Sequence, residues 1–224
     1  MKKILTSTLL AATVLGAGLA VSSNANAATL EKGASTNAAV SFKAGDEGQV
    51  IPPVDPTDPT KPTDPGDNGN TGNNGNLAIV YATKDVNFGS NLAIPTKTLT
   101  VKSSDKVSLE VGDVRGTDAG WALSIQADQF KSGSDVLTGA VLSIDKSDDV
   151  KVAEANPSTV TAVSNAVTDA TTASVALNAV KGTGSGVTVD NLAAGKIKLV
   201  VPAGVAKAKA YSTTMNWTLS DVPA

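Results

Sequence analysis

Cysteine and histidine are both absent from this chain of 224 residues. Their absence excludes disulfide bonds, thiolate and imidazole metal ligands, cysteine-linked lipid anchors, and Ser-His-Asp or Cys-His catalysis. Aromatic residues make up only 3% of the chain, so its core must be built mainly from aliphatic side chains. We predict no catalytic residues, no metal ligands and no cofactor, and we expect that the protein is not an enzyme.

Positive charge is also scarce. Lysine and arginine together number 18 against 21 acidic residues, and Arg115 is the only arginine. The formal net charge is therefore −3. Proteins that bind nucleic acid usually present a basic patch with interleaved aromatic residues, and the sequence contains none. We expect no nucleic-acid partner.

The N-terminus has the three parts of a secretory signal peptide. A basic start, Met1-Lys2-Lys3, precedes an apolar run over residues 9–21 and a small-residue ending at Ala27. We place the signal peptide at residues 1–27. An uncleaved membrane anchor is the alternative, but the run is short for a bilayer. We expect a secreted mature chain with no membrane span, and the C-terminus shows no motif for covalent attachment.

Two segments follow before the main domain. Residues 28–51 form an N-terminal segment, and residues 39–42 within it are a candidate strand of the domain. Residues 52–76 are of low complexity, with Asp-Pro-Thr repeats followed by Asn and Gly. Proline fixes φ, so the Asp-Pro-Thr half is predicted to be extended and the Gly/Asn half flexible. The low-complexity segment is either a linker or a loop within the domain, with residues 39–42 packing back onto the domain as a strand.

Residues 77–224 show the alternation of short β-strands. About eight runs of period two are separated by Gly, Asn and Asp turns, which predicts an all-β fold, an antiparallel sandwich or a barrel-like domain of eight or more strands. The stretch 158–173 is either a short helix or a loop with strand pieces. The predicted strands lie near residues 77–81, 99–101, 107–111, 121–125, 140–144, 175–179, 197–201 and 211–219.

The last predicted strand shows the strictest alternation. Tyr211, Met215, Trp217 and Leu219 share one face, and hydroxyl and amide residues occupy the other. The same Trp-x-Leu pattern occurs once more, at residues 121–123, and these are the only two tryptophans. We interpret both as core residues, with stacking on a glycan as the alternative.

Arg115 lies in a glycine-bracketed loop shortly before Trp121. Its guanidinium could fork onto Asp113 or Asp118, or stack on an indole. A structural ion pair and a ligand contact are both compatible with this position.

These residues together resemble a known family. The pattern Val-Gly-Asp-Val-Arg115-Gly, followed by Trp121-Ala-Leu123 and closed by Trp217-Thr-Leu219-Ser-Asp-Val-Pro223, is similar to the WxL-domain surface proteins of low-GC Gram-positive bacteria. The segment Val86-Asn-Phe-Gly89 and the Pro-Val-Asp-Pro-Thr repeat resemble the same family.

The resemblance implies a secreted, cell-wall-associated protein that binds peptidoglycan non-covalently. It also implies association with WxL-interacting and sortase-anchored surface proteins. An interaction module that docks onto another surface protein, rather than onto glycan, is the alternative function. The candidate wall-binding or motif residues, which could equally be core residues, are Trp121, Leu123, Trp217, Leu219, Tyr211 and Arg115.

Overall fold

The computed structural model describes residues 36–63, 69–152, 160–163, 165–167 and 172–224. The predicted signal peptide, residues 1–27, lies outside this part of the chain. The chain divides into two units, Met1–Ser41 and Phe42–Ala224, and the strands found in the described residues belong to the second. Across the described residues there are fourteen strands and no α-helix, so the all-β prediction is confirmed. Within those ranges no helix is available that could cross a bilayer.

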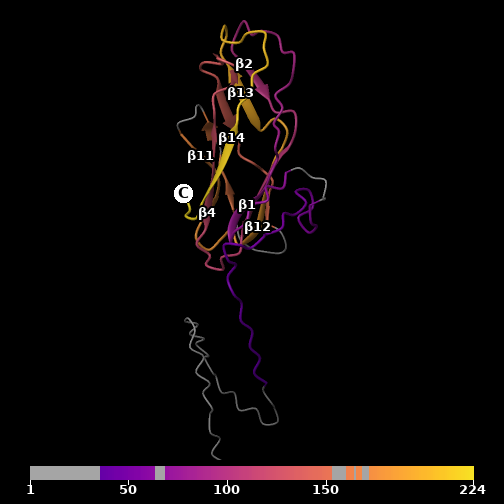
Figure 1. Ribbon diagram of the computed structural model, residues 1–224, viewed down its shortest axis with the longest axis vertical. Helices are drawn as coiled ribbons and strands as arrows, with labels where there is room; N and C mark the ends of the chain where they lie inside the picture. The colour runs from indigo at the N-terminus through magenta and orange to yellow at the C-terminus, as the bar shows by residue number, and fades with distance from the viewer. Residues whose placement is uncertain (1–35, 64–68, 153–159, 164, 168–171) are drawn as a thin grey trace, which may run out of the picture. The chain divides into compact units, whose positions relative to one another are not determined.

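Twelve of the strands form three antiparallel sheets of four (Figure 1). The first sheet has the order β1 (Leu77–Ala82), β3 (Val107–Asp113), β12 (Gly186–Leu192), β8 (Val150–Val152). The second has the order β10 (Asn165–Val167), β7 (Val141–Ile144), β13 (Ile197–Val201), β2 (Leu99–Lys102). The third has the order β14 (Met215–Ser220), β4 (Trp121–Ala127), β11 (Ser174–Ala179), β9 (Thr161–Ala162). The remaining two, β5 (Lys131–Ser132) and β6 (Asp135–Val136), pair with each other.

One hydrophobic core joins the three sheets. Side chains alternate across a strand, so each sheet can direct one row of aliphatic residues inward. All three sheets contribute to a single buried cluster, in which the side chains have little or no exposed surface. Among its almost completely buried members from the three sheets are Leu109, Val111, Trp121, Leu123, Ile125, Ile144, Leu177 and Ile197.

The strand β12 was not predicted from the sequence. It occupies a central position, paired with β3 on one side and β8 on the other. Both of its faces are covered, and Thr188, Asp190 and Asn191 are buried within it. A strand that is buried on both faces and has polar residues loses the simple alternation that marks a half-exposed strand.

Residues 158–173 were left open between a helix and a loop with strand pieces. Their described part contains β9 and β10, so strand pieces are what the structure shows there. Ser158, the predicted helix cap, lies outside the described residues.

Residues 45–63, here called the strap, cover the outer face of the first sheet. Ile51 is buried against Ala78 and Val80 and packs over Gly112, where a Cβ would lie 2.7 Å from the isoleucine Cγ2. The strap is also held by hydrogen bonds to two buried polar side chains of the sheet. Val54 N–H donates to Glu110 Oε2 at 2.9 Å, and Asn191 Nδ2 donates to the carbonyl of Pro56 at 2.7 Å.

The described part of the Asp-Pro-Thr half, residues 52–63, is folded into turns, so the extended conformation predicted for it is wrong. Asp55 Oδ1 accepts hydrogen bonds from the N–H and the hydroxyl of Thr57, at 2.7 and 2.6 Å. Asp58 repeats the pattern with the hydroxyl of Thr60 at 2.6 Å and pairs with Lys61 at 2.7 Å. Asp and Thr side chains stabilise turns in this way, and the prediction considered only the effect of proline on φ.

Residues 39–42 are not a strand. Residues 36–46 contain no strand in the described chain, and the Phe42 side chain is 92% exposed. Residues near the predicted boundaries at 51/52 and 76/77 contact the first sheet: Ile51 and Val54 do so in the strap, and Thr71 N–H donates to the carbonyl of Val80 at 3.1 Å.

Candidate functional site

The two Trp-x-Leu patterns lie on neighbouring strands. β14 pairs antiparallel with β4, which sets Leu219 opposite Leu123 and Trp217 opposite Ile125. The two tryptophans are not cross-strand partners, because the β4 residue opposite Trp217 is Ile125. Trp121 itself lies opposite Ala179 of β11, on the other side of β4. Two segments far apart in the sequence thus lie side by side in the third sheet (Figure 1).

Trp121 is a core residue. Its side chain is fully buried, and its indole Nε1 donates to the carbonyl of Gly184 at 3.0 Å. Gly184 lies in the glycine-rich turn between β11 and β12, with φ of +82°, and a Cβ there would come within 2.5 Å of the indole nitrogen. The turn therefore closes over the indole and satisfies its only polar group. Trp121 offers no surface to a ligand in this structure.

The Arg115 guanidinium forms a bidentate ion pair with the Asp113 carboxylate. Nε donates to Oδ1 at 3.0 Å and Nη2 to Oδ2 at 2.7 Å, and the two side chains are 12% and 2% exposed. Nη2 also donates to the carbonyl of Gly120 at 2.7 Å, and Nη1 to that of Asp221 at 3.2 Å. The hydrogen bonds to Asp113 raise the pKa of the guanidinium above its ordinary value. Arg115 therefore connects the loop after β3 to the residue that follows β14.

The C-terminal residues are fastened at the same place. Asn178 exchanges two hydrogen bonds with Ala224, from its Nδ2 to the carbonyl at 3.3 Å and from the Ala224 N–H to its Oδ1 at 3.0 Å. A Cβ on Gly120, whose φ is +80°, would come within 2.8 Å of the Pro223 ring. These contacts fix the end of β14 and give Arg115, Gly120 and Pro223 a structural role.

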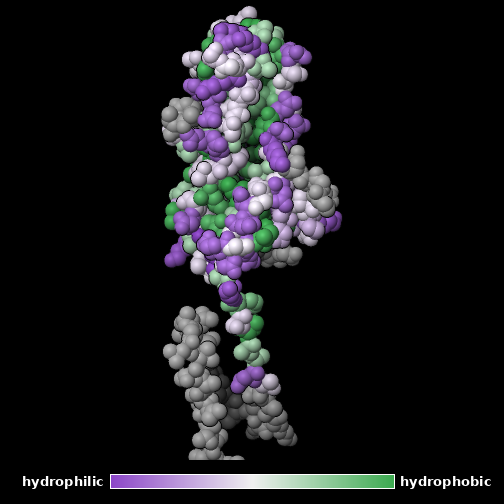
Figure 2. All heavy atoms as spheres, viewed as in Figure 1, coloured by the Kyte–Doolittle hydropathy of each residue, from purple (hydrophilic) through white to green (hydrophobic). Residues whose placement is uncertain are grey.

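Trp217 borders an open cleft instead of lying fully in the core. The cleft has a volume of about 1250 Å³. It is bordered by the segment after β1 (residues 82–95), by β2 and β13, and by residues 206–217. On the face drawn in Figure 2, hydrophobic residues are recessed between polar ones in the upper part of the view. The predicted alternation of burial is confirmed, with Asn216 and Thr218 exposed, but β14 begins at Met215, so residues 211–214 of the predicted strand lie outside it. Its apolar face is only half-buried, and Met215 and Trp217 of that face line the cleft.

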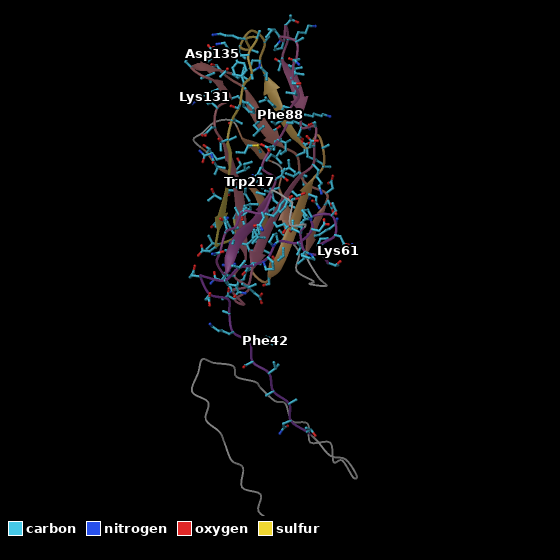
Figure 3. The ribbon with its side chains drawn as sticks, turned by 45° about the vertical axis from the view of Figure 1, so that its right-hand side comes forward. Phe42, Lys61, Phe88, Lys131, Asp135 and Trp217 are labelled. Atoms are coloured by element: carbon cyan, nitrogen blue, oxygen red, sulfur yellow. The ribbon has the colours of Figure 1, made fainter. Side chains whose placement is uncertain are left out.

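Four aromatic side chains line the cleft. Phe88 and Phe130 meet edge to face, with ring centroids 6.0 Å apart. Tyr211 and Trp217 also line the cleft and are half-buried, and Figure 3 labels Phe88 and Trp217. Leu92 and Ile94 add apolar surface at the rim, with 51% and 48% of their surface exposed. Large concave apolar sites with a few polar groups are typical ligand-binding surfaces.

A carboxylate anchors two lysines at the cleft. Lys207 and Lys209 both line it, and both form ion pairs with Asp135, one with each carboxylate oxygen. The hydrogen bonds from Lys207 and Lys209 lower the pKa of Asp135 to about 2. The N–H of Lys207 also donates to the Tyr211 hydroxyl at 3.1 Å. Lys207 and Lys209, here called the lysine pair, are therefore held beside Tyr211 at the cleft.

The structure thus separates the residues that the sequence had grouped together. Trp121 and Leu123 are fully buried, Arg115 fastens the C-terminal residues, and Leu219 is half-buried. Of the six candidates, Tyr211 and Trp217 line the cleft. Sequence reasoning did not identify the lysine pair, Leu92, Ile94 or Phe130. Phe88 was noted only as part of a resembling segment.

The WxL family, described as a surface cell-wall-binding domain, matches residues 29–223. No curated protein and no solved structure matches the chain. The family match extends over most of the chain, including the strap, all fourteen strands and both borders of the cleft. The chain therefore belongs to the WxL-domain family, whose members are surface proteins that bind the cell wall.

Proposed function

We propose that the protein, secreted after removal of residues 1–27, attaches to the cell wall by binding peptidoglycan non-covalently in the aromatic cleft. Membership of a wall-binding family supports attachment to the wall in general. The cleft supports this location, because among the described residues it combines a large open volume with partly exposed aromatic side chains. The proposal assigns the protein a binding role and no catalytic role.

The single observation that supports the cleft most strongly is the contrast between the two tryptophans. Trp121 is fully buried and its indole nitrogen is paired, so it serves the fold. Trp217 is half-buried and lines the cleft together with Tyr211. An aromatic side chain that keeps part of its surface open can bury that surface against a ligand.

The test uses exposed residues, so that binding is changed without loss of the fold. Leu92 and Ile94 line the cleft and are half-exposed. The double variant L92S/I94S removes apolar contact surface there. Val180 and Val222 are 51% and 60% exposed and do not line the cleft, so V180S/V222S is the matched control.

The measurement is co-sedimentation of each purified mature protein with sacculi that have been stripped of protein. We expect wild type and V180S/V222S to pellet equally, and L92S/I94S to bind at least tenfold more weakly while unfolding at the same temperature. Equal binding of all three would exclude the cleft as the contact. No pelleting of the folded wild type would refute peptidoglycan binding.

A second candidate function is docking onto another surface protein, such as a WxL-interacting or sortase-anchored protein. β14 is an edge strand and contains neither charge nor proline, the features that usually protect an edge from pairing with another chain. A partner strand could add to it. Tight binding to a purified protein partner with weak binding to bare sacculi would favour this function.

A further inference from the structure

We infer that the part of peptidoglycan held in the cleft is the stem peptide, bound as an extended strand with a carboxylate at the lysine pair. This inference rests on the proposed function and names the substrate class for the same site. Three features of the cleft point to a peptide: its borders, its apolar interior and its charge.

The first feature is that edge strands of two sheets border the cleft. β14 ends the third sheet and β2 ends the second, and the cleft is lined by Met215 and Trp217 of one and Leu99 and Val101 of the other. An edge strand presents N–H and C=O groups along one side. A peptide has backbone groups spaced to pair with such an edge, whereas a sugar ring does not.

The second feature is that the interior between the two edges is apolar. Val107, Leu137, Leu199 and Val201 form its floor. Sugar hydroxyls lose hydrogen bonds when they are buried against aliphatic side chains, which costs free energy. The methyl groups of an alanine-rich peptide lose none, so burial of these groups is favourable.

The third feature is the excess of positive charge at the lysine pair. Two ammonium groups share the single carboxylate of Asp135, so one positive charge is left without an opposite charge in this cluster. In peptidoglycan the lactyl carboxyl of the muramic acid is consumed by the amide bond to the peptide. The free carboxylates therefore lie on the stem peptides, and the charge of the lysine pair complements them.

The test compares three preparations of sacculi with the full mature protein. Intact sacculi contain glycan, peptide and phosphate polymers. Hydrofluoric acid removes the phosphate polymers, which are another source of negative charge. Subsequent amidase treatment removes the stem peptides and leaves soluble glycan strands, to which binding is measured by analytical ultracentrifugation. Binding to intact sacculi tests the proposed function separately from this inference.

We expect binding to survive removal of the phosphate polymers and to fall at least tenfold once the peptides are removed. The variant K207Q/K209Q should bind intact sacculi about tenfold more weakly and lose most of the salt dependence, whereas K106Q/K181Q, at two exposed lysines that do not line the cleft, should behave as wild type. Full binding to peptide-free glycan would overturn the inference while leaving the proposed function intact. Loss of binding with the phosphate polymers, or wild-type binding by K207Q/K209Q, would overturn it as well.

Discussion

Replacing Arg115 by methionine should destabilise the fold by breaking a nearly buried ion pair. The Asp113 carboxyl would lose the guanidinium that now pairs with it, in a site where its side chain is only 2% exposed. The carbonyls of Gly120 and Asp221 would each lose a donor as well. Methionine retains most of the length of the side chain, so the change reports mainly on charge and hydrogen bonding.

The magnitude follows from what is left behind. Removing one partner of a buried pair typically costs about 3–5 kcal/mol, because the other charge stays buried and uncompensated. Arg115 is 12% exposed, so water can reach the site, and the lower end, about 3 kcal/mol, is expected. The unfolding free energy of a domain of this size falls by about 2 kcal/mol per molar urea, so the urea concentration at the unfolding midpoint should fall by about 1.5 M.

Urea unfolding followed by tryptophan fluorescence measures this change, and a second variant isolates its cause. In D113N/R115M the buried charge is gone, so this double variant should recover about 1–2 kcal/mol of the loss seen in R115M. A loss below about 1 kcal/mol in R115M, or no recovery in the double variant, would refute the reasoning that this pair holds the end of β14 in place.

Three further predictions concern stability. G184A should cost about 3 kcal/mol in thermal or urea unfolding, because φ is +82° and the new Cβ would lie 2.5 Å from the Trp121 indole; an unchanged midpoint would contradict the role of this turn. Burial raises the pKa of Asp190 from 3.8 to about 6. Between pH 4 and pH 6 the folded state therefore holds a proton that the unfolded state has released, and the unfolding free energy should fall by about 2 kcal/mol between pH 4 and pH 7 in wild type relative to D190N; parallel pH profiles would contradict this. N191A should cost about 2 kcal/mol and speed hydrogen exchange in the strap, since Asn191 donates to Pro56 and accepts from Ser108; unchanged exchange in the strap would show that it is held by other contacts.

The fold class and much of the third sheet could be predicted from the sequence. Half-exposed strands such as β14 show their alternation directly, because one row of side chains contacts the protein and the other contacts water. β12 was missed because both of its faces are buried and polar residues such as Asp190 interrupt the apolar pattern. The Asp-Pro-Thr part of the strap was wrongly predicted as extended, because the prediction used the effect of proline on φ and not the Asp and Thr hydrogen bonds that form its turns.

The candidate site was only partly predictable. Trp217 could be selected by its pattern, but the same pattern occurs at Trp121, and only the packing of the three sheets separates a cleft residue from a core residue. The lysine pair depends on Asp135, which lies far away in the sequence, so no local spacing could reveal it. Long-range contacts of this kind determine the site, whereas local patterns determine the strands.

The most direct test of the cleft as the wall contact is acrylamide quenching of tryptophan fluorescence while soluble peptidoglycan fragments are added. Trp121 is fully buried and should not respond, so the signal reports on Trp217. We predict a saturable decrease in quenching in wild type and in V180S/V222S, and no change in W217F. Saturable binding of the fragments, seen by calorimetry, without any change in the quenching of Trp217 would contradict the account.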